Sequence, residues 1–291
     1  MIPLKLKRIR LFIIALTFLG LFASCNQTTK NSNVEIVVKK TKTIEKPPYN
    51  TNDTKGMLMA IAEANGGFNK LLTLRDVEFD YNYISPDGKK DVSKERYIFR
   101  NETSWAKYTT HEVNVPSTIE GDVVQFFDGQ KATVYENQKP LNDPQVIGTG
   151  QFLRQANYFW FTMMFKLTDP GVISEYKGQE DINGATYDLL YVTYNPEITG
   201  KEQNDIFILY INPESRMVES FKFSLPAFGV SEPVLLAELT YEEINGIQVI
   251  IRRVMSSPKP DGSGMTLLVD QQTSNVKFNN GFTTLQLSSD N

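Results

Sequence analysis

Acidic side chains are the residues of this sequence that could carry out acid–base chemistry. Glu180 and Asp181 precede one Asn-Gly turn, and Glu238, Glu242 and Glu243 precede another. A pair of carboxylates can act as acid and nucleophile on a glycosidic bond, which makes a carbohydrate hydrolase one candidate function. Acidic residues beside such a turn are usually solvated, so this is the least favoured of the functions considered below.

Histidine and serine chemistry finds little support in the sequence. His111 is the only histidine, so zinc sites with two or three histidine ligands are excluded, and we expect its ring to be solvated. Residues 261–264 place Ser263 between glycines but lack the strand-to-helix context of a nucleophile elbow. The sequence also lacks a glycine-rich loop followed by a helix that could hold a phosphate. We therefore expect no enzyme, no metal site and no cofactor.

The single cysteine, Cys25, closes an N-terminal segment typical of a secretory signal. Four basic residues lie between positions 5 and 10, and an apolar run follows over residues 11–22. This run of about a dozen residues is too short to span a hydrocarbon core of roughly 30 Å as a helix. Residues 1–24 are therefore predicted to be a signal peptide.

Residues 21–25, of sequence LFASC, resemble the lipobox of bacterial lipoproteins, in which the cysteine thiol is acylated and becomes the mature N-terminus. The resemblance implies lipid attachment at Cys25, where several acyl chains such as palmitate give a stable membrane anchor. Acylation also excludes a nucleophilic pair of Cys25 and His111. Residues 26–30 lack both the Asp that resembles an inner-membrane retention signal and the acidic cluster of surface-export signals. The expected location is the periplasmic face of the outer membrane.

The composition after Cys25 separates a tether from a folded domain. Residues 26–52 are polar and rich in Lys, Thr and Asn, so residues 25–52 are interpreted as the lipidated N-terminus with a flexible tether. Residues 53–291 are expected to form a single domain. Without the four basic residues of the signal, about 26 of the 30 basic side chains remain against 34 acidic ones. This negative balance excludes nucleic acid as an electrostatic partner.

Residues 151–166 are predicted to form a helix that is apolar nearly all round. At about 100° per residue, its apolar side chains fall on two opposite sides. Such a helix must be enclosed by the protein or must face an apolar ligand. It is therefore interpreted either as a central core helix or as a helix with one side bordering a cavity. One side carries Phe152, Ala156, Phe159, Trp160, Met163 and Met164, and the other carries Tyr158, Phe161 and Phe165.

A period of two dominates the chain after residue 76 and predicts strands. Residues 77–83 alternate between apolar or aromatic side chains and polar ones. Asp-Gly or Asn-Gly pairs at 128–129, 183–184 and 245–246 predict three of the hairpins. In total, the sequence predicts about eleven strands and two main helices, which is an α+β fold made mostly of antiparallel β-structure.

The two ends of this domain carry further signals. A first helix is predicted to begin with a cap at residues 52–54 and to end at the Asn-Gly-Gly of residues 65–67. At the other end, residues 276–287 are interpreted as the closing strand, with Leu285 and Leu287 among its apolar positions.

The order of these motifs resembles the LolA/LolB-like lipoprotein-carrier superfamily. The resemblance lies in the glycine-terminated first helix, the meandering strands, the aromatic helix followed by residues 167–170 (LTDP), and the hairpin motif of residues 178–184 (GQEDING). It implies an incomplete, strongly curved barrel of about eleven strands, with helices covering or filling its mouth and an apolar interior suited to acyl chains. Unlike the soluble periplasmic carrier of that superfamily, this chain has its own predicted lipid anchor.

Three functions are compatible with these patterns. The first is an anchored, non-catalytic module that binds a lipid, acyl chain or other apolar ligand, with the membrane and other envelope proteins as further partners. The second is a structural or protein-interaction lipoprotein with a solid core, and the third is the carbohydrate hydrolase. The side chains expected to line the cavity of the first are Phe79, Tyr81, Phe99, Trp105, Phe126, Tyr158, Phe161, Phe165, Tyr191, Phe207, Phe221 and Phe223.

Overall fold

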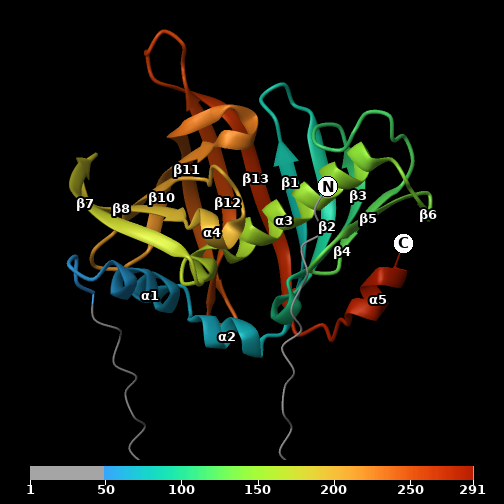
Figure 1. Cartoon of the computed structure of the whole chain (residues 1–291), viewed down its shortest axis with the longest axis horizontal. Coiled ribbons are helices and arrows are strands. Elements are labelled where there is room, and N and C mark those ends of the chain that lie inside the picture. Colours follow the sequence, from blue (N-terminus) through green and yellow to red (C-terminus); the bar gives the residue numbers. More distant parts are fainter. Residues whose placement is uncertain (1–48, 291) are drawn as a thin grey trace, which may run out of the picture. The chain divides into compact units, whose positions relative to one another are not determined.

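An antiparallel sheet organises the chain in the computed structural model, which describes residues 49–290 (Figure 1). The predicted signal peptide, Cys25 and residues 26–48 lie outside this range. Thirteen strands follow the spatial order β6-β5-β4-β3-β2-β1-β13-β12-β11-β10-β9-β8-β7. Because β6 and β7 each have one neighbour in this order, the described sheet is open, as predicted. The strands are β1 (Asp76–Ile84), β2 (Lys90–Ile98), β3 (Thr103–His111), β4 (Val123–Phe127), β5 (Ala132–Glu136), β6 (Lys139–Pro140), β7 (Val172–Ile182), β8 (Ala185–Tyr194), β9 (Phe207–Ile211), β10 (Val218–Leu225), β11 (Val230–Ile244), β12 (Ile247–Pro258) and β13 (Met265–Phe278).

The strand count of thirteen corrects the eleven predicted, and the strands that were not predicted are the two-residue β6 and β13 near the C-terminus. β13 is 14 residues long and pairs with both β1 and β12, although its sequence shows little alternation of apolar residues. The polar Gln271 occupies one of the buried positions of β13, so the alternation of apolar and polar residues is interrupted there. Leu285 and Leu287 do not continue a strand but lie in the helix α5 (Thr284–Ser289). Thr283 caps this helix by accepting a hydrogen bond from the Gln286 amide at 3.2 Å.

The turn residues confirm the three hairpins that the sequence predicted. Asn183 and Gly184 have φ angles of 52° and 84°, and Asn245 and Gly246 have φ angles of 55° and 75°. Two consecutive residues with positive φ form the type I′ turn, whose twist matches that of the flanking strands. At the third hairpin, the Asp128 side chain accepts hydrogen bonds from the amides that follow it. Local turn chemistry therefore sets the register of β4–β5, β7–β8 and β11–β12.

Two helices precede the sheet, and the first agrees with the prediction. α1 (Thr54–Ala64) is capped by Asp53, whose carboxylate accepts from the Gly56 amide at 2.9 Å. Met57 and Ile61 on its inner side are fully buried in the same cluster as residues of β8 to β12. α2 (Phe68–Thr73) follows after Gly67, and the short α4 (Pro196–Thr199) lies between β8 and β9.

The central helix α3 (Pro144–Lys166) begins seven residues earlier than the sequence predicted. Asp143 accepts a hydrogen bond from the Gln145 amide at 2.8 Å, and the proline in the first turn has no amide to satisfy. Gly148 and Gly150 weaken the helical signal in this region, because glycine is a poor helix former. Gly150 is needed here, since a Cβ atom would lie 2.5 Å from Val134 of β5.

Both sides of α3 are enclosed, as the core-helix interpretation predicted. Met163 and Met164 are buried in the cluster formed with α1 and β8 to β12, whereas Tyr158 and Phe165 are buried in a cluster with β1 and β2. The exception is Phe152, which is 45% exposed and contacts the Phe228 ring at 5.5 Å between centroids. Figure 1 shows α3 running across the sheet in front of β1 to β5.

Removal of the cap of α3 provides a first test of this arrangement. We expect Asp143→Ala to lower the free energy of unfolding by about 1 kcal/mol, because two amides lose their acceptor. Asp143→Asn retains an acceptor at the same place and is expected to have a smaller effect. Urea denaturation of the three proteins measures both changes, and an equal loss in the two variants would contradict a capping role.

Candidate binding site beneath helix α3

A buried ion pair joins the N-terminal half of α3 to the sheet. The guanidinium of Arg154 pairs with the Glu95 carboxylate of β2, and both side chains have no exposed surface. Tyr97 donates to Glu95 at 2.9 Å and Ser93 donates to it at 2.8 Å. Arg154 also donates to the Tyr108 hydroxyl at 3.1 Å and to an amide oxygen of β4. Since both charges are paired and hydrogen-bonded, this cluster acts as a structural clamp on α3.

A second buried arginine lies under the middle of α3 and has a different environment. Arg253 of β12 donates to the Gln271 side chain at 2.7 Å and to the main-chain oxygen of Trp160 at 2.8 Å. Its guanidinium carbon lies 4.9 Å from the centre of the Trp160 ring. Its Nε–H has no hydrogen-bond partner, and no ion pair of Arg253 occurs within residues 49–290. Burial lowers the pKa of Arg253 to about 10, so the side chain is still a cation at neutral pH.

Two small hollows adjoin these groups. The first, which we call the Arg253 hollow, has a volume of about 20 Å³. The second, the Asp91 hollow, has a volume of about 30 Å³ and shares Tyr81 and Asn157 with the first. A water molecule needs roughly 10–15 Å³ by this measure, so each hollow has room for one or two waters and not for an acyl chain. The side chains that line the Arg253 hollow are mainly rings, with a few polar groups among them. They are Phe79, Tyr81, Tyr97, Asn157, Trp160, Phe161, Ile250, Arg253 and Thr273.

Tyr81 is a further polar group without a partner at this place. Its hydroxyl is buried and has no hydrogen bond within the described residues. Burial raises the pKa of Tyr81 well above its ordinary value, so the hydroxyl stays protonated and can donate. Native proteins pair the great majority of buried polar side chains, so two unsatisfied donors beside one hollow are an unusual feature.

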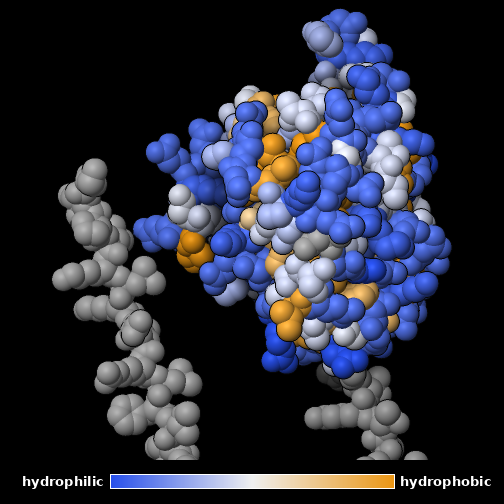
Figure 2. Space-filling view, turned by 90° about the vertical axis from the view of Figure 1, so that its right-hand side faces the viewer, coloured by the Kyte–Doolittle hydropathy of each residue, from blue (hydrophilic) through white to orange (hydrophobic). Residues whose placement is uncertain are grey.

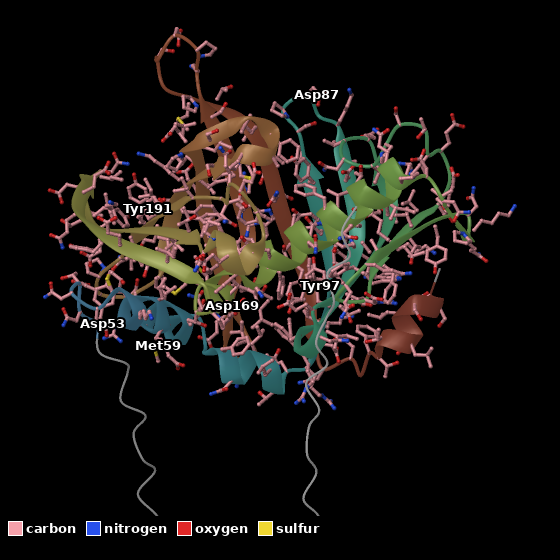
Figure 3. The ribbon with its side chains drawn as sticks, in the orientation of Figure 1. Asp53, Met59, Asp87, Tyr97, Asp169 and Tyr191 are labelled. Atoms are coloured by element: carbon pink, nitrogen blue, oxygen red, sulfur yellow. The ribbon has the colours of Figure 1, made fainter. Side chains whose placement is uncertain are left out.

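Nine of the twelve residues predicted to line a cavity lie on the α3 side of the sheet. They divide between its two apolar clusters, and Figure 3 shows Tyr97 of the first cluster close to α3. Most of them are fully packed, and three also contribute to the Arg253 hollow. The first cluster contains Phe79, Tyr81, Phe99, Tyr158, Phe161 and Phe165, and the second contains Phe207, Phe221 and Phe223.

The other three predicted cavity residues lie elsewhere, which corrects the prediction for them. Trp105 and Phe126 belong to a separate cluster with Leu287 of α5. They point away from α3 because the inward positions of β3 are taken by Ala106 and Tyr108. Tyr191 alternates with the buried residues of β8 and lies on the opposite face, where it contacts the Lys177 ammonium. The sequence predicted a strand at the residues of α5, so the covering of Trp105 and Phe126 by a helix was not predicted.

Sequence reasoning did not single out the three buried charges beneath α3. Arg154 could have been noticed, because it lies four residues after Gly150 and four before Tyr158, on one stripe of the helix. A charged residue on a buried stripe requires a partner. Glu95 and Arg253 carry no comparable signal, because each stands next to other charged residues in its strand: Glu95 lies between Lys94 and Arg96, and Arg253 follows Arg252.

The acidic residues considered for hydrolysis do not converge in the structure. Glu180 and Asp181 are exposed on β7, whereas Glu238, Glu242 and Glu243 are exposed on β11. Three strands separate β7 from β11, which places them about 19 Å apart at the usual strand spacing. A glycosidase pair needs a separation of roughly 5–9.5 Å. These side chains therefore have the solvated character that their turns predicted.

His111 lies at the end of β3, as its sequence context predicted. His111 hydrogen-bonds through Nε2 to the main-chain oxygen of Gly121 at 3.1 Å, at the edge of a loop. Within residues 49–290, no group of three or more His, Cys, Asp or Glu side chains is placed to hold a metal ion.

The surface carries apolar side chains in small patches. Figure 2 shows such patches on one face, separated by hydrophilic side chains. Met59, Phe68 and Leu72 are exposed on α1 and α2. None of the helices in the described part of the chain is sufficiently long and apolar to cross a bilayer.

The chain is similar to a protein family and to several crystal structures. The family described as being of unknown function, DUF6503, matches residues 86–230. A search of curated proteins finds no match. A LolA superfamily protein from Nitrosomonas europaea is 14% identical with a TM-score of 0.44, over 76% of this chain and 93% of that chain. A DUF1329 family protein from Desulfovibrio piger is 10% identical with a TM-score of 0.46, over 81% of this chain and 96% of that chain.

A third similar structure is the lipoprotein LppX from Mycobacterium tuberculosis. It is 13% identical with a TM-score of 0.27, over 78% of this chain and 97% of that chain. The LolA-like fold predicted from the motifs is thus found among the structural matches. A likeness at these identities and TM-scores brings no ligand, activity or partner to this chain.

Proposed function

We propose that this chain is a non-catalytic lipoprotein of the cell envelope that binds an amphiphile or another apolar molecule beneath α3. In this proposal Cys25 carries the lipid anchor, and the outer membrane is the expected location. The observation that carries the proposal is the covering of an open, apolar sheet face by one helix, with hollows and unsatisfied donors at their interface.

Ligand entry requires side chains of α3 to move, because the hollows hold only about one or two waters each. The ion pair of Arg154 and Glu95 holds the first half of the helix. Beside the Arg253 hollow, the contacts are mainly between rings, with Phe161 stacked on Phe79 at 4.9 Å and Trp160 stacked on Phe221 at 5.9 Å. An apolar chain can replace ring–ring contacts by ring–chain contacts without exposing apolar surface.

A solid protein-interaction domain is the second candidate. The small volume of the two hollows favours it, as do the exposed Met59, Phe68 and Leu72 on α1 and α2. The two candidates differ in one property, which is whether the interior beneath α3 takes up an apolar chain.

Quenching of Trp160 fluorescence distinguishes the two candidates. The chain contains two tryptophans, Trp105 under α5 and Trp160 at the Arg253 hollow, so the Trp105→Phe variant reports on Trp160 alone. We expect a dibrominated C18 fatty alcohol, which is neutral, to quench this variant in a saturable way. The matched Trp160→Phe variant keeps only Trp105 and is expected to show little quenching. Absence of saturable quenching in the folded Trp105→Phe protein would favour the solid core.

A further inference from the structure

The Arg253 hollow has two buried hydrogen-bond donors that are unpaired within the described residues. The unpaired groups are the Nε–H of Arg253 and the hydroxyl of Tyr81, and both residues line this hollow. Arg253 is 4% exposed, so its guanidinium cannot turn to bulk water. The other two nitrogens of Arg253 are held by Gln271 and by the main chain of Trp160, which fixes the direction of the free Nε–H.

The nearby carboxylates are already satisfied by other groups. Glu95 is paired with Arg154 and accepts from Ser93 and Tyr97. Asp91 lines the other hollow, where it accepts from two main-chain amides and from the Asn114 side chain. Arg253 therefore remains a buried cation without an anionic partner, held by two hydrogen bonds and the Trp160 ring, and an anion at its free Nε–H would stabilise it further.

We propose that the Arg253 hollow binds the carboxylate of a long-chain amphiphile, an inference that rests on the function proposed above and names its class of ligand. Arg253 Nε and the Tyr81 hydroxyl donate to the two carboxylate oxygens. The hydrocarbon chain then lies among Phe79, Phe161 and Ile250, which line the same hollow.

The shape and the donors of the hollow favour a carboxylate over a phosphate. A carboxylate is planar and has two oxygens, which matches two free donors in a small hollow that the stacked Phe79 and Phe161 rings help to line. A phosphate has more charged oxygens than this hollow has free donors, so some would be buried without partners.

The experiment compares two ligands that differ only in their head group. In the Trp105→Phe protein, we expect dibrominated stearic acid to quench Trp160 at a concentration about 10- to 100-fold lower than dibrominated stearyl alcohol, because the acid adds a charge-assisted hydrogen bond. Arg253→Met in the same protein is expected to abolish this preference while the alcohol still binds. Arg252→Met is the matched control, since Arg252 is the preceding residue but is exposed and pairs with Asp270.

The outcomes separate the two proposals. Equal affinity for acid and alcohol, unchanged in Arg253→Met, would overturn the carboxylate site and leave the binding function in place. Failure of both ligands to quench would overturn the binding function itself. Displacement of the acid by an equal concentration of acetate would contradict a long-chain ligand. Should Arg253→Met fold poorly, Tyr81→Phe removes only the second donor, and we expect it to reduce the preference about 5- to 10-fold.

Discussion

Replacing Glu95 by Leu is expected to lower the free energy of unfolding by about 3–5 kcal/mol. The substitution leaves the guanidinium of Arg154 buried beneath α3 with no carboxylate partner. It also removes the acceptor for Tyr97 and Ser93. The substitution should weaken the attachment of the N-terminal half of α3 to the sheet. Denaturation by guanidinium chloride, followed by circular dichroism, measures the loss of free energy of unfolding.

A double variant tests whether the unpaired charge causes this loss. Glu95→Leu combined with Arg154→Met removes both charges, so we expect the part of the loss that comes from the unpaired guanidinium to return, while Tyr97 and Ser93 still lack their acceptor. Glu175→Leu is the matched control, because Glu175 pairs with Lys177 on β7 where it is 64% exposed. We expect the control to change stability by less than about 1 kcal/mol. A loss below about 1 kcal/mol in Glu95→Leu itself would instead show that Arg154 reaches solvent or another partner.

The parts of the fold that local chemistry determines could be predicted from the sequence. The Asn-Gly pairs at 183–184 and 245–246 adopt the positive φ angles that their hairpins need, and Asp53 caps α1 as expected. The two-sided character of the aromatic helix also follows from its residues, since both sides are buried against different parts of the sheet.

The parts that tertiary packing determines could not be predicted. The inward-facing Gln271 of β13 hydrogen-bonds to Arg253 of β12. A polar residue therefore occupies a buried position of β13, and the alternation typical of a strand cannot be recognised in its sequence. Leu285 and Leu287 are two residues apart and fit a strand, but α5 leaves Leu285 81% exposed and buries Leu287. That helix covers Trp105 and Phe126, which reverses the side of the sheet on which they were expected.

The site depends on residues that share no local signal. Arg253 lacks an anionic partner, while Glu95 pairs with Arg154. This pairing depends on how α3 packs on strands that are far apart in the sequence, so it has no local signal. Aromatic composition predicted where apolar contacts would form. It could not predict that these contacts fill the interior almost completely, nor that two of the six unpaired buried polar atoms of the described residues belong to side chains at one small hollow.

Replacing Phe161 by Ala is expected to have two opposite effects, which together test whether this ring plugs a binding site. The ring of Phe161 lies 4.9 Å from Phe79, 5.7 Å from Tyr97 and 6.4 Å from Phe99. Its removal should lower the free energy of unfolding by about 3 kcal/mol, because a cavity forms among these rings. The same cavity adjoins the Arg253 hollow and should admit an apolar chain, as apolar cavities in protein cores bind apolar molecules.

The affinity of the Phe161→Ala variant for the dibrominated alcohol, measured in the Trp105→Phe background, shows whether Phe161 occupies the ligand's space or contacts the bound ligand. If Phe161 fills the space that the chain would occupy, its loss lowers the concentration needed to quench Trp160. If the ring instead forms part of a wall that holds the chain, its loss weakens binding. Phe152→Ala is the control on the same helix, since Phe152 is 45% exposed and its one aromatic partner within residues 49–290 is Phe228. We expect that control to change stability by less than about 1 kcal/mol and to leave the affinity unaltered.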